Sequence, residues 1–221
     1  MPAPHTIPTV QHVCQTLTRA IHEGRLVPGQ RLTELELSRK LSVSRPTIRE
    51  AFRQLCVDGL LHSQPHRGVC VRHLTRQDVD EHFMIRANLE VLAVRLAAPI
   101  LQQAPAPLLT LQDHLNKAEQ DGNGADIAFY NHAFHQLFAK TSGNSLLQSI
   151  LNRIASLIYG LQLKALIEDQ QTGHLSSAHQ DITSAILAGR NEDAARLMAD
   201  HIDHSRQRIQ WLDDSCFAPP Q

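Results

Sequence analysis

Several polar residues in the second half of the chain stand where their side chains could hold a metal ion. His179 and His201 each interrupt an apolar stripe of helical period, so both imidazoles should point toward a core. Asn131 and His135 are four residues apart, which places them on one face of a third helix, about 5.4 Å apart along its axis. Imidazoles that converge from separate helices commonly bind zinc, nickel or another divalent ion. The alternative is that each histidine is a core residue bonded to a backbone carbonyl.

A second set of such residues lies near position 45. Arg45 and Arg49 are one turn apart on a predicted helix that begins after Ser44, so they project from the same face. The planar guanidinium of arginine can donate two hydrogen bonds to O6 and N7 of guanine. Thr47 lies between them and could bond a phosphate or contact a thymine methyl. The pattern favours DNA contact by Ser44, Arg45, Thr47 and Arg49; the alternative is that the arginines only solvate an exposed helix.

Three short helices are predicted around these arginines. The first runs from Val10 to Gly24, and the second is capped by Thr33 in a Thr-x-x-Glu pattern. The third begins after Ser44 and carries Pro46 in its first turn, where the missing N–H costs little. In a helix-turn-helix the start of the second helix of the motif enters the major groove. This fold would therefore place Arg45 and Arg49 against base edges.

A β-hairpin is predicted directly after these helices. Residues 60–63 and 69–72 have strand character, and they flank a turn at 64–68 that contains proline and glycine. In that turn His66 and Arg67 could reach the DNA backbone or minor groove, while Gly68 permits close approach. The alternative for these three residues is a plain hairpin turn. Three helices and a hairpin make a winged helix-turn-helix domain, which we place at residues 8–74.

The rest of the chain is predicted to be entirely helical. A Thr75 to Asp78 capping pattern marks the boundary, and the second domain should span residues 75–214. About six helices are expected, near residues 78–98, 106–121, 125–141, 145–169, 173–188 and 191–212. The fold class is therefore mainly α, with an N-terminal winged domain and a C-terminal all-α bundle.

Charge and composition agree with a DNA-binding first domain. Residues 1–74 hold ten Lys/Arg against five Asp/Glu, whereas residues 75–221 hold eleven against seventeen, so only the first part suits a polyanion. No apolar run approaches the ~20 residues of a membrane span, and residues 1–13 lack the features of a secretory signal. The four cysteines are scattered. We expect a cytoplasmic protein with no membrane segment and four free thiols.

The first domain resembles the DNA-binding domain of GntR-family regulators. The similarity covers about residues 10–72 and lies in residues 21–34, in 43–51 and from Leu55 to Leu60. Two positions depart from the usual pattern: Ser42 replaces a common glycine, and Pro46-Thr47 inverts the usual Thr-Pro order. An operator sequence cannot therefore be transferred from relatives.

The second domain resembles the effector domain of the FadR branch of that family, the FCD domain, in its shorter VanR-like form. The similar segments are residues 86–90, 131–135, 177–179 and 188–201. In the family one Asp and three His usually bind a divalent metal beside a small carboxylate effector. The resemblance implies a site of Asn131, His135, His179 and His201, in which the amide of Asn131 is a weaker ligand than a carboxylate. It also implies that Arg86 holds the effector; the alternative is a surface ion pair with Glu90.

Together these features predict a homodimeric transcription regulator, usually a repressor, that binds double-stranded operator DNA. A small organic acid bound beside a zinc or nickel ion would change the spacing of the two winged domains. A second hypothesis makes the metal itself the signal. A third is a metallohydrolase with a catalytic zinc, but the sequence has no His-Glu-x-x-His and no general base tied to the cluster. We expect no enzymatic activity.

Overall fold

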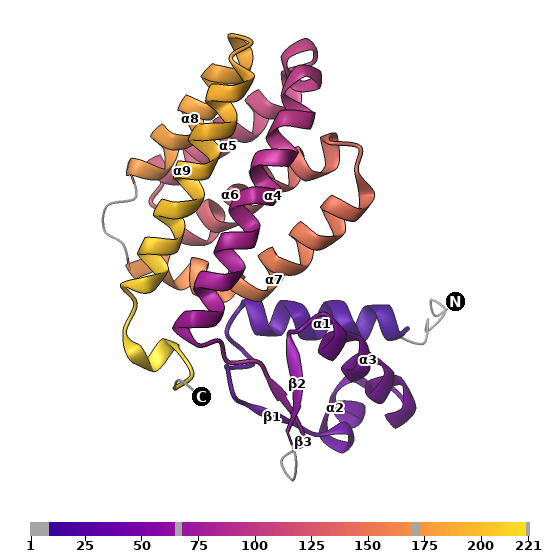
Figure 1. Cartoon of the computed structure of the whole chain (residues 1–221). Coiled ribbons are helices and arrows are strands. Elements are labelled where there is room, and N and C mark those ends of the chain that lie inside the picture. Colours follow the sequence, from indigo (N-terminus) through magenta and orange to yellow (C-terminus); the bar gives the residue numbers. More distant parts are fainter. Residues whose placement is uncertain (1–8, 65–67, 169–172, 220–221) are drawn as a thin grey trace. The chain divides into compact units, whose positions relative to one another are not determined.

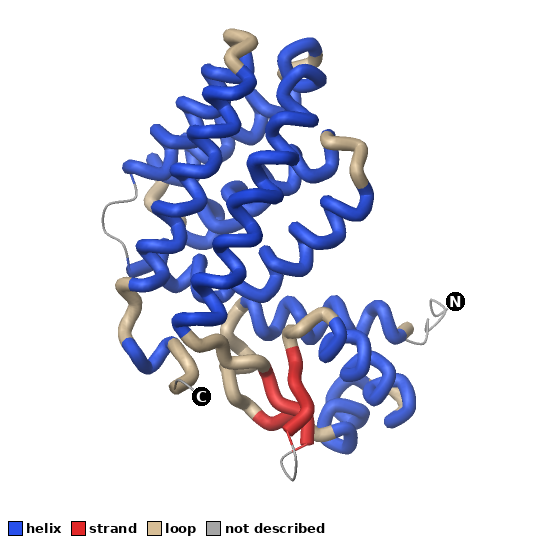
Figure 2. The backbone as a smooth tube through the Cα atoms, in the orientation of Figure 1, coloured by secondary structure: helices blue, strands red, loops and turns tan. Residues whose placement is uncertain are grey.

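A computed structural model describes residues 9–64, 68–168 and 173–219 of the chain. The chain divides into two compact units, Met1–His73 and Leu74–Gln221. In the described part there are nine α-helices and one small antiparallel sheet (Figure 1), and the strands all belong to the first unit (Figure 2). The mainly α fold class predicted from the sequence is confirmed.

The first unit is a winged helix-turn-helix. Its elements are α1 (Val10–His22), β1 (Arg31–Leu32), α2 (Glu34–Leu41), α3 (Arg45–Val57), β2 (Leu61–Gln64) and β3 (Gly68–Val71). The sheet has the order β1-β3-β2, so the predicted hairpin of β2 and β3 gains a third strand. A two-residue strand has no alternating pattern to reveal it, because it becomes a strand only by pairing with β3.

The core of the first unit comes from the inward faces of α1 and α3, which pack against each other. Its fully buried residues recur at helical spacing, as expected for amphipathic helices: they include Val13, Leu17, Ile48, Ala51, Phe52 and Leu55. Packing of this face leaves the opposite side of α3 exposed to solvent. Of the residues predicted to contact DNA, Ser44, Arg45, Thr47 and Arg49 lie on that exposed side or at the start of the helix.

The turn between α2 and α3 has a left-handed residue at its centre. Ser42 has φ 54° and ψ 41° and forms the C-cap of α2, with its N–H bonded to the carbonyl of Ser38. Glycine is the usual residue at such a cap because a Cβ is unfavourable there. The serine that departs from the family pattern therefore occupies the strained position of the turn.

The second unit is a bundle of six helices, as predicted. They are α4 (Arg76–Gln103), α5 (Ala106–Gln120), α6 (Gly124–Thr141), α7 (Ser145–Glu168), α8 (Gly173–Leu187) and α9 (Asn191–Gln210), followed by the short 3-10 helix η1 (Asp214–Cys216). The Thr75–Asp78 capping box is present with both of its bonds. α4 runs on through Pro99 to Gln103, five residues beyond the predicted end. It packs chiefly against α9 and α6.

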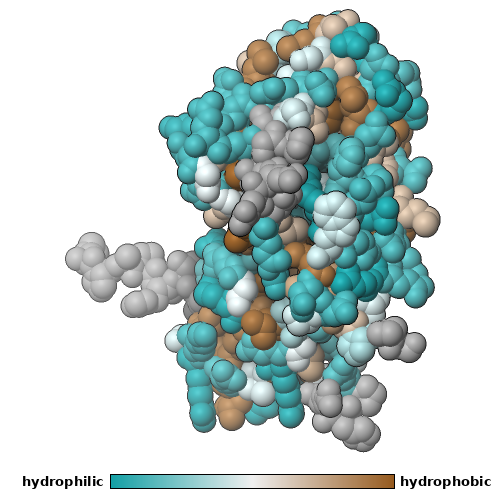
Figure 3. All heavy atoms as spheres, turned by 90° about the vertical axis from the view of Figure 1, so that its left-hand side faces the viewer, coloured by the Kyte–Doolittle hydropathy of each residue, from teal (hydrophilic) through white to brown (hydrophobic). Residues whose placement is uncertain are grey.

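α7 is the most apolar long helix in the described part of the chain. By length and composition alone, Ser145–Glu168 could cross a membrane, although the sequence reading found no run approaching that length. Core helices of bundles meet the same criterion, and α7 buries Leu147, Leu151 and Ile158 in the bundle core. Figure 3 shows one face of the molecule, where hydrophilic residues predominate and hydrophobic ones form only small groups. α7 therefore packs one face into the bundle core, while only 33% of its most apolar window is buried.

The segment after α9 is bound back to the beginning of α4. The Arg76 guanidinium donates to the carbonyls of Gln210 and Leu212 and to Asp214, the last two at 2.8 and 2.6 Å. It also stacks over the ring of Phe217, 4.1 Å from the centroid. Ala218 donates its N–H to the carbonyl of Leu74 at 2.9 Å. The two ends of the second unit are therefore held together by one arginine and a backbone bond.

Candidate functional site

The N-terminus of α3 presents the polar residues that were predicted to contact DNA. Ser44 is the N-cap, and its hydroxyl accepts from the N–H of Thr47 and lies 2.7 Å from the Thr47 hydroxyl. Arg45 and Arg49 follow on the exposed side, with 58% and 65% of their side chains accessible. A helix N-terminus also offers N–H groups and a positive dipole to a phosphate. The arrangement suits a helix that lies in a DNA groove.

Both arginines of α3 contact a carboxylate that the sequence analysis did not single out. Glu34, the first residue of α2, accepts from Nε and Nη2 of Arg49 at 2.7 and 2.8 Å, and from Nη2 of Arg45 at 3.4 Å. The hydrogen bonds from Arg49 hold the pKa of Glu34 below its usual value. No spacing rule within one helix could reveal this contact, because Glu34 reaches the arginines only through the packing of α2 against α3.

The wing is described only in part. Gly68 begins β3 with φ +78°, a conformation that a side chain would strain. A Cβ placed on Gly68 would lie 3.8 Å from Nε of Arg31, so the exposed Arg31 of β1 lies beside the wing. His66 and Arg67, also predicted to contact DNA, lie outside the described residues. Arg31 is a candidate that the sequence analysis missed, since its position depends on β1 pairing with β3.

Three histidines of the second unit converge on one point, as predicted. His135 of α6, His179 of α8 and His201 of α9 are buried, and their ligand nitrogens all lie within 4.8 Å of one another. Nε2 of His135 and Nε2 of His201 are 3.2 Å apart. The ring of His179 lies 4.5 Å from that of His201 and packs edge-on against Phe134. Three separate helices thus bring their imidazoles to one place.

Burial keeps the imidazoles of His135 and His201 in the form that can bind a metal. It lowers the pKa of His201 well below the usual value, and the neighbouring His179 and His135 add to the effect. Burial also lowers the pKa of His135, although the carboxylate of Glu90 opposes it. A histidine must be neutral to donate a ring nitrogen to a metal. Both are therefore neutral near pH 7.

The spacing of the nitrogens suits a divalent ion. Zinc binds imidazole nitrogen at about 2.0–2.1 Å, so two tetrahedral ligands lie about 3.3 Å apart. The separation of 3.2 Å between His135 and His201 is close to that value. It also suits a direct hydrogen bond between two neutral imidazoles, which is the alternative of a self-satisfied histidine core. The residues fit a metal, and the geometry does not distinguish zinc from nickel.

A buried ion pair lies behind His135. Arg86 and Glu90 of α4 are each 2% exposed, and Nε of Arg86 lies 3.2 Å from Oε1 of Glu90. The same Oε1 lies 3.2 Å from Nδ1 of His135, within ion-pair distance but without the geometry of a formed hydrogen bond. The alternative of a surface Arg86–Glu90 pair is therefore wrong: the pair forms, but inside the bundle. A carboxylate behind a metal-binding histidine commonly orients its ring.

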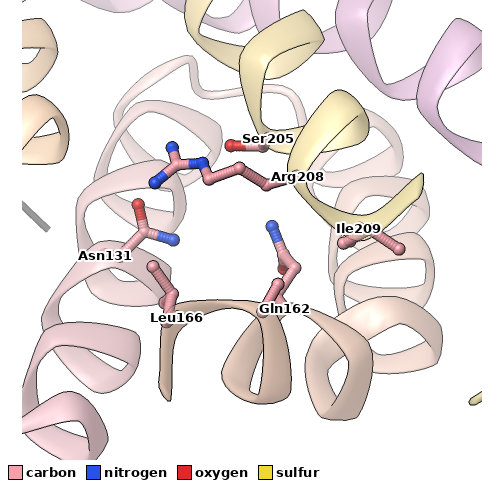
Figure 4. Close-up of a pocket in the computed structure, with 7 residues that line it drawn as sticks. Asn131, Gln162, Leu166, Ser205, Arg208 and Ile209 are labelled. Atoms are coloured by element: carbon pink, nitrogen blue, oxygen red, sulfur yellow. The ribbon is translucent and has the colours of Figure 1, made fainter. Parts of the chain in front are cut away.

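Asn131 faces a small cavity one turn from the histidines. The cavity has a volume of about 20 Å³ and is lined by Asn131, Gln162, Ala165, Leu166, Ser205, Arg208 and Ile209. Figure 4 shows the polar ends of Asn131, Gln162, Ser205 and Arg208 directed toward this space. The side-chain oxygen of Asn131 is buried and has no hydrogen-bond partner among the described residues. It is available to a ligand in the cavity.

Gln162, Ser205 and Arg208 line the cavity but were not predicted from the sequence. Ser205 and Arg208 follow His201 by four and seven residues on α9, so periodicity places them on the same face. The inward position predicted for His201 therefore also predicts inward positions for Ser205 and Arg208. Gln162 lies on α7, and only the packing of the bundle brings it to the cavity. The cavity therefore extends the faces of α6 and α9 that carry His135 and His201.

Family models match most of the chain. The model described as "Bacterial regulatory proteins, gntR family" matches residues 9–71, and the model of the "FCD domain" matches residues 81–204. The first match covers the elements of the winged unit from α1 to β3. The second contains the three histidines, Asn131 and the Arg86–Glu90 pair.

Individual proteins are similar over nearly their full length. The HTH-type transcriptional regulator YdhC of Bacillus subtilis strain 168 is 30% identical over 198 residues, 89% of this chain and 88% of that protein. The HTH-type transcriptional repressor RspR of Escherichia coli K12 is 25% identical over 94% of this chain and 91% of its own. The solved structure of E. coli McbR/YncC matches 93% of this chain and 98% of its own with a TM-score of 0.78 at 23% identity, a likeness of fold.

Proposed function

We propose that this chain, which belongs to the GntR family of bacterial regulatory proteins and carries an FCD domain, is a cytoplasmic repressor controlled by a ligand in its helical unit. Its relatives are transcriptional regulators, so it is a regulator and not an enzyme, and the metallohydrolase hypothesis is set aside. The observation that carries the proposal is the pairing of an exposed arginine face on α3 with a buried three-histidine cluster in the second unit.

DNA binding is assigned to the start of α3 and to the wing. Arg45 and Arg49 would read base edges, while Ser44 and Thr47 at the helix N-terminus would contact phosphate. His66, Arg67 and Gly68 of the wing would approach the backbone or minor groove. Operator binding is the common property of regulators of this family.

The ligand site is assigned to the histidine cluster and the adjoining cavity. A divalent metal would be held by His135, His179 and His201, with Asn131 as the fourth ligand, and it would supply a positive charge that attracts a carboxylate. Arg86 supports an organic acid as effector because its Nη1 is buried without a partner among the described residues. Arg208 is a second guanidinium for the same role, since it lines the cavity that Asn131 faces.

A homodimer is part of the proposal. α4 carries a stripe of exposed aliphatic side chains at helical spacing, namely Ile85, Leu92, Leu96 and Ile100, each between 41% and 54% accessible. Exposed apolar side chains gathered on one face of a helix are typical of a surface that another chain covers. Two copies would present two winged units to two half-sites of an operator.

One observation favours the alternative in which the metal itself is the signal. The cavity beside the histidines has a volume of only about 20 Å³, little more than one water molecule needs. An organic acid would have to displace side chains to enter, whereas a metal ion needs only small movements of the imidazole rings. The two versions share the site and differ in the ligand that changes DNA affinity.

The decisive experiment titrates DNA affinity against each ligand in turn. The purified protein is bound to its own promoter region at several salt concentrations, first without metal, then with zinc or nickel, then with metal and a panel of small organic acids. We expect sequence-dependent binding that weakens only when metal and acid are both present. Abolition of binding by metal alone would support the metal-signal version, and no sequence-dependent binding under any condition would overturn both.

A further inference from the structure

We infer that Glu34 is a specificity-determining residue, which positions Arg45 and Arg49 for base reading and lowers affinity for DNA of any other sequence. This inference rests on the proposed assignment of Arg45 and Arg49 to base contacts. It concerns a residue of α2, outside the recognition helix itself. Three features of the contact carry it.

The first feature is that the Glu34 carboxylate binds the side edge of the Arg49 guanidinium. Glu34 accepts from Nε at 2.7 Å and from Nη2 at 2.8 Å, so it holds the side edge of the guanidinium in a two-bond fork. Nη1 and the second hydrogen of Nη2 point away from this edge. They form the end-on pair of donors that matches O6 and N7 of guanine. Glu34 thus fixes the guanidinium plane and leaves the base-reading edge available.

The second feature is that one carboxylate contacts both arginines. Oε2 of Glu34 accepts from Arg49 and also lies 3.4 Å from Nη2 of Arg45. The bridge restricts two long side chains that are otherwise 58% and 65% exposed. Long side chains lose rotamer freedom when they bind, and a partner that orders them beforehand reduces that loss at the correct sequence. At an incorrect sequence the same arrangement hinders the arginines from turning to other acceptors.

The third feature is charge. Glu34 places a negative charge between two arginines, on a surface proposed to face phosphates, and the Arg49 hydrogen bonds lower its pKa so that it stays ionised. A carboxylate there opposes the non-specific attraction to the DNA backbone that every basic surface has. Binding to a random duplex is weakened by this charge. Binding to the correct duplex regains affinity from the ordered base contacts.

The test compares matched variants of the full-length protein on two DNA probes. One probe is the duplex that the wild-type protein enriches from a random-sequence pool, and the other is a random duplex of equal length. Glu34→Gln keeps the size of the side chain and removes its charge. Glu50→Gln is the control, because it removes the same charge from α3 itself, where Glu50 bonds Arg53 and Gln54 instead of the reading arginines.

We expect Glu34→Gln to bind the random duplex more tightly, with a salt dependence steeper by about one. Its preference for the enriched duplex should fall about 10-fold or more, the effect of one misplaced base contact. Glu50→Gln should leave that preference unchanged. Glu34→Asp retains the charge but is too short to bridge both arginines, so it should lose preference without gaining affinity for the random duplex.

Each other outcome overturns the inference. An unchanged preference in Glu34→Gln, or an equal loss in Glu34→Gln and Glu50→Gln, means that Glu34 does not position the arginines. Circular dichroism of each variant shows whether it has folded. If Glu34→Gln does not fold, the duplex preference of Glu34→Asp tests the positioning role of Glu34. Arg49→Ala separates this inference from the proposed function. If Arg49→Ala loses the preference for the enriched duplex and Glu34→Gln keeps it, only the role of Glu34 is removed. A wild-type protein with no sequence preference would remove both.

Discussion

The arginines of α3 and the histidines of the bundle hold their polar groups in opposite environments. Arg45 and Arg49 are more than half exposed and share a carboxylate partner, Glu34. His135, His179 and His201 are at most 3% exposed, and burial holds His135 and His201 neutral. The exposed pair is suited to a large, highly charged partner that arrives from solvent. The buried cluster is suited to a small ion that replaces water and protons.

Because of this contrast, the arginine site and the histidine cluster should depend differently on ionic strength and pH. Contacts between exposed charges are screened by salt, so the first site should respond to ionic strength. A buried cluster of imidazoles is little affected by salt, but protons compete with a metal for the same nitrogens. Substitutions and solution conditions should therefore affect the two sites separately.

The largest expected effect is on metal affinity. His201→Ala and His135→Ala should each weaken binding of zinc or nickel by ~100-fold or more, because one ligand of a structural site contributes about 2.5–4 kcal/mol. Competition with a coloured chelator measures this. His204→Ala is the control, since His204 is exposed on the same helix. DNA binding by the metal-free protein should persist in all three, and unaltered metal stoichiometry in both ligand variants would remove the site assignment.

The next largest effect is on DNA recognition. Arg49→Ala should lose ~1–3 kcal/mol of sequence-specific binding, because a base-reading fork is removed from the exposed face of α3. Fluorescence anisotropy with a specific and a random duplex measures the loss. Arg53→Ala, an exposed arginine paired with Glu50 on the same helix, should retain the preference. Metal affinity should be unchanged in both, and equal specific binding by Arg49→Ala and wild type would show that the register of α3 on DNA is wrong.

Acid should destabilise the metal-free protein through the buried histidines. Burial lowers the pKa of His135 and His201 in the folded state, so the unfolded chain binds more protons below about pH 6.5. The two histidines therefore do not reduce the free energy of unfolding above about pH 6.5. As the pH falls below this value, the free energy of unfolding decreases by up to ~1.4 kcal/mol per pH unit for each histidine. Urea unfolding between pH 7 and 5 measures the slope. Saturating metal should reduce the slope of the free energy of unfolding near pH 7. Constant stability of the metal-free protein across this range would contradict the prediction.

The smallest expected effect lies in the turn before the recognition helix. Ser42→Gly should stabilise the protein by about 0.5–1 kcal/mol, because glycine relieves the left-handed strain at φ 54° but costs some chain entropy. Denaturant unfolding measures the gain. Ser42→Ala, which keeps a Cβ, should give none. Metal affinity should not change, since Ser42 belongs to the first unit; a gain from both substitutions would mean that strain is not the cause.

Local patterns predicted most of the elements of both units. Ser44 and Thr75 mark helix starts because a side-chain oxygen three residues before a free N–H satisfies it in almost any fold. The inward positions of His179 and His201 followed from the apolar residues around them, and both are buried. These properties depend on neighbours within one or two turns, which the sequence displays directly.

The features that the sequence did not predict depend on contacts between distant segments. β1 exists only because Arg31 and Leu32 pair with Cys70 and Val69. The Glu34 bridge depends on how α2 packs against α3, and the burial of Arg86 depends on where α4 sits among α6 and α9. The family resemblance supplied the ligand set, but the Arg86–Glu90 pair was a surface contact in one alternative and is an interior one in the structure.

The tie between the C-terminal segment and α4 has a mechanical consequence. α9 carries His201, and the residues just beyond it are fastened by Arg76 and by the bond from Ala218 to Leu74. Leu74 is joined directly to His73, the final residue of the winged unit. Any displacement of the last turn of α9 therefore acts on the residue at which the second unit begins, and Arg76→Ala would remove the side-chain part of this connection.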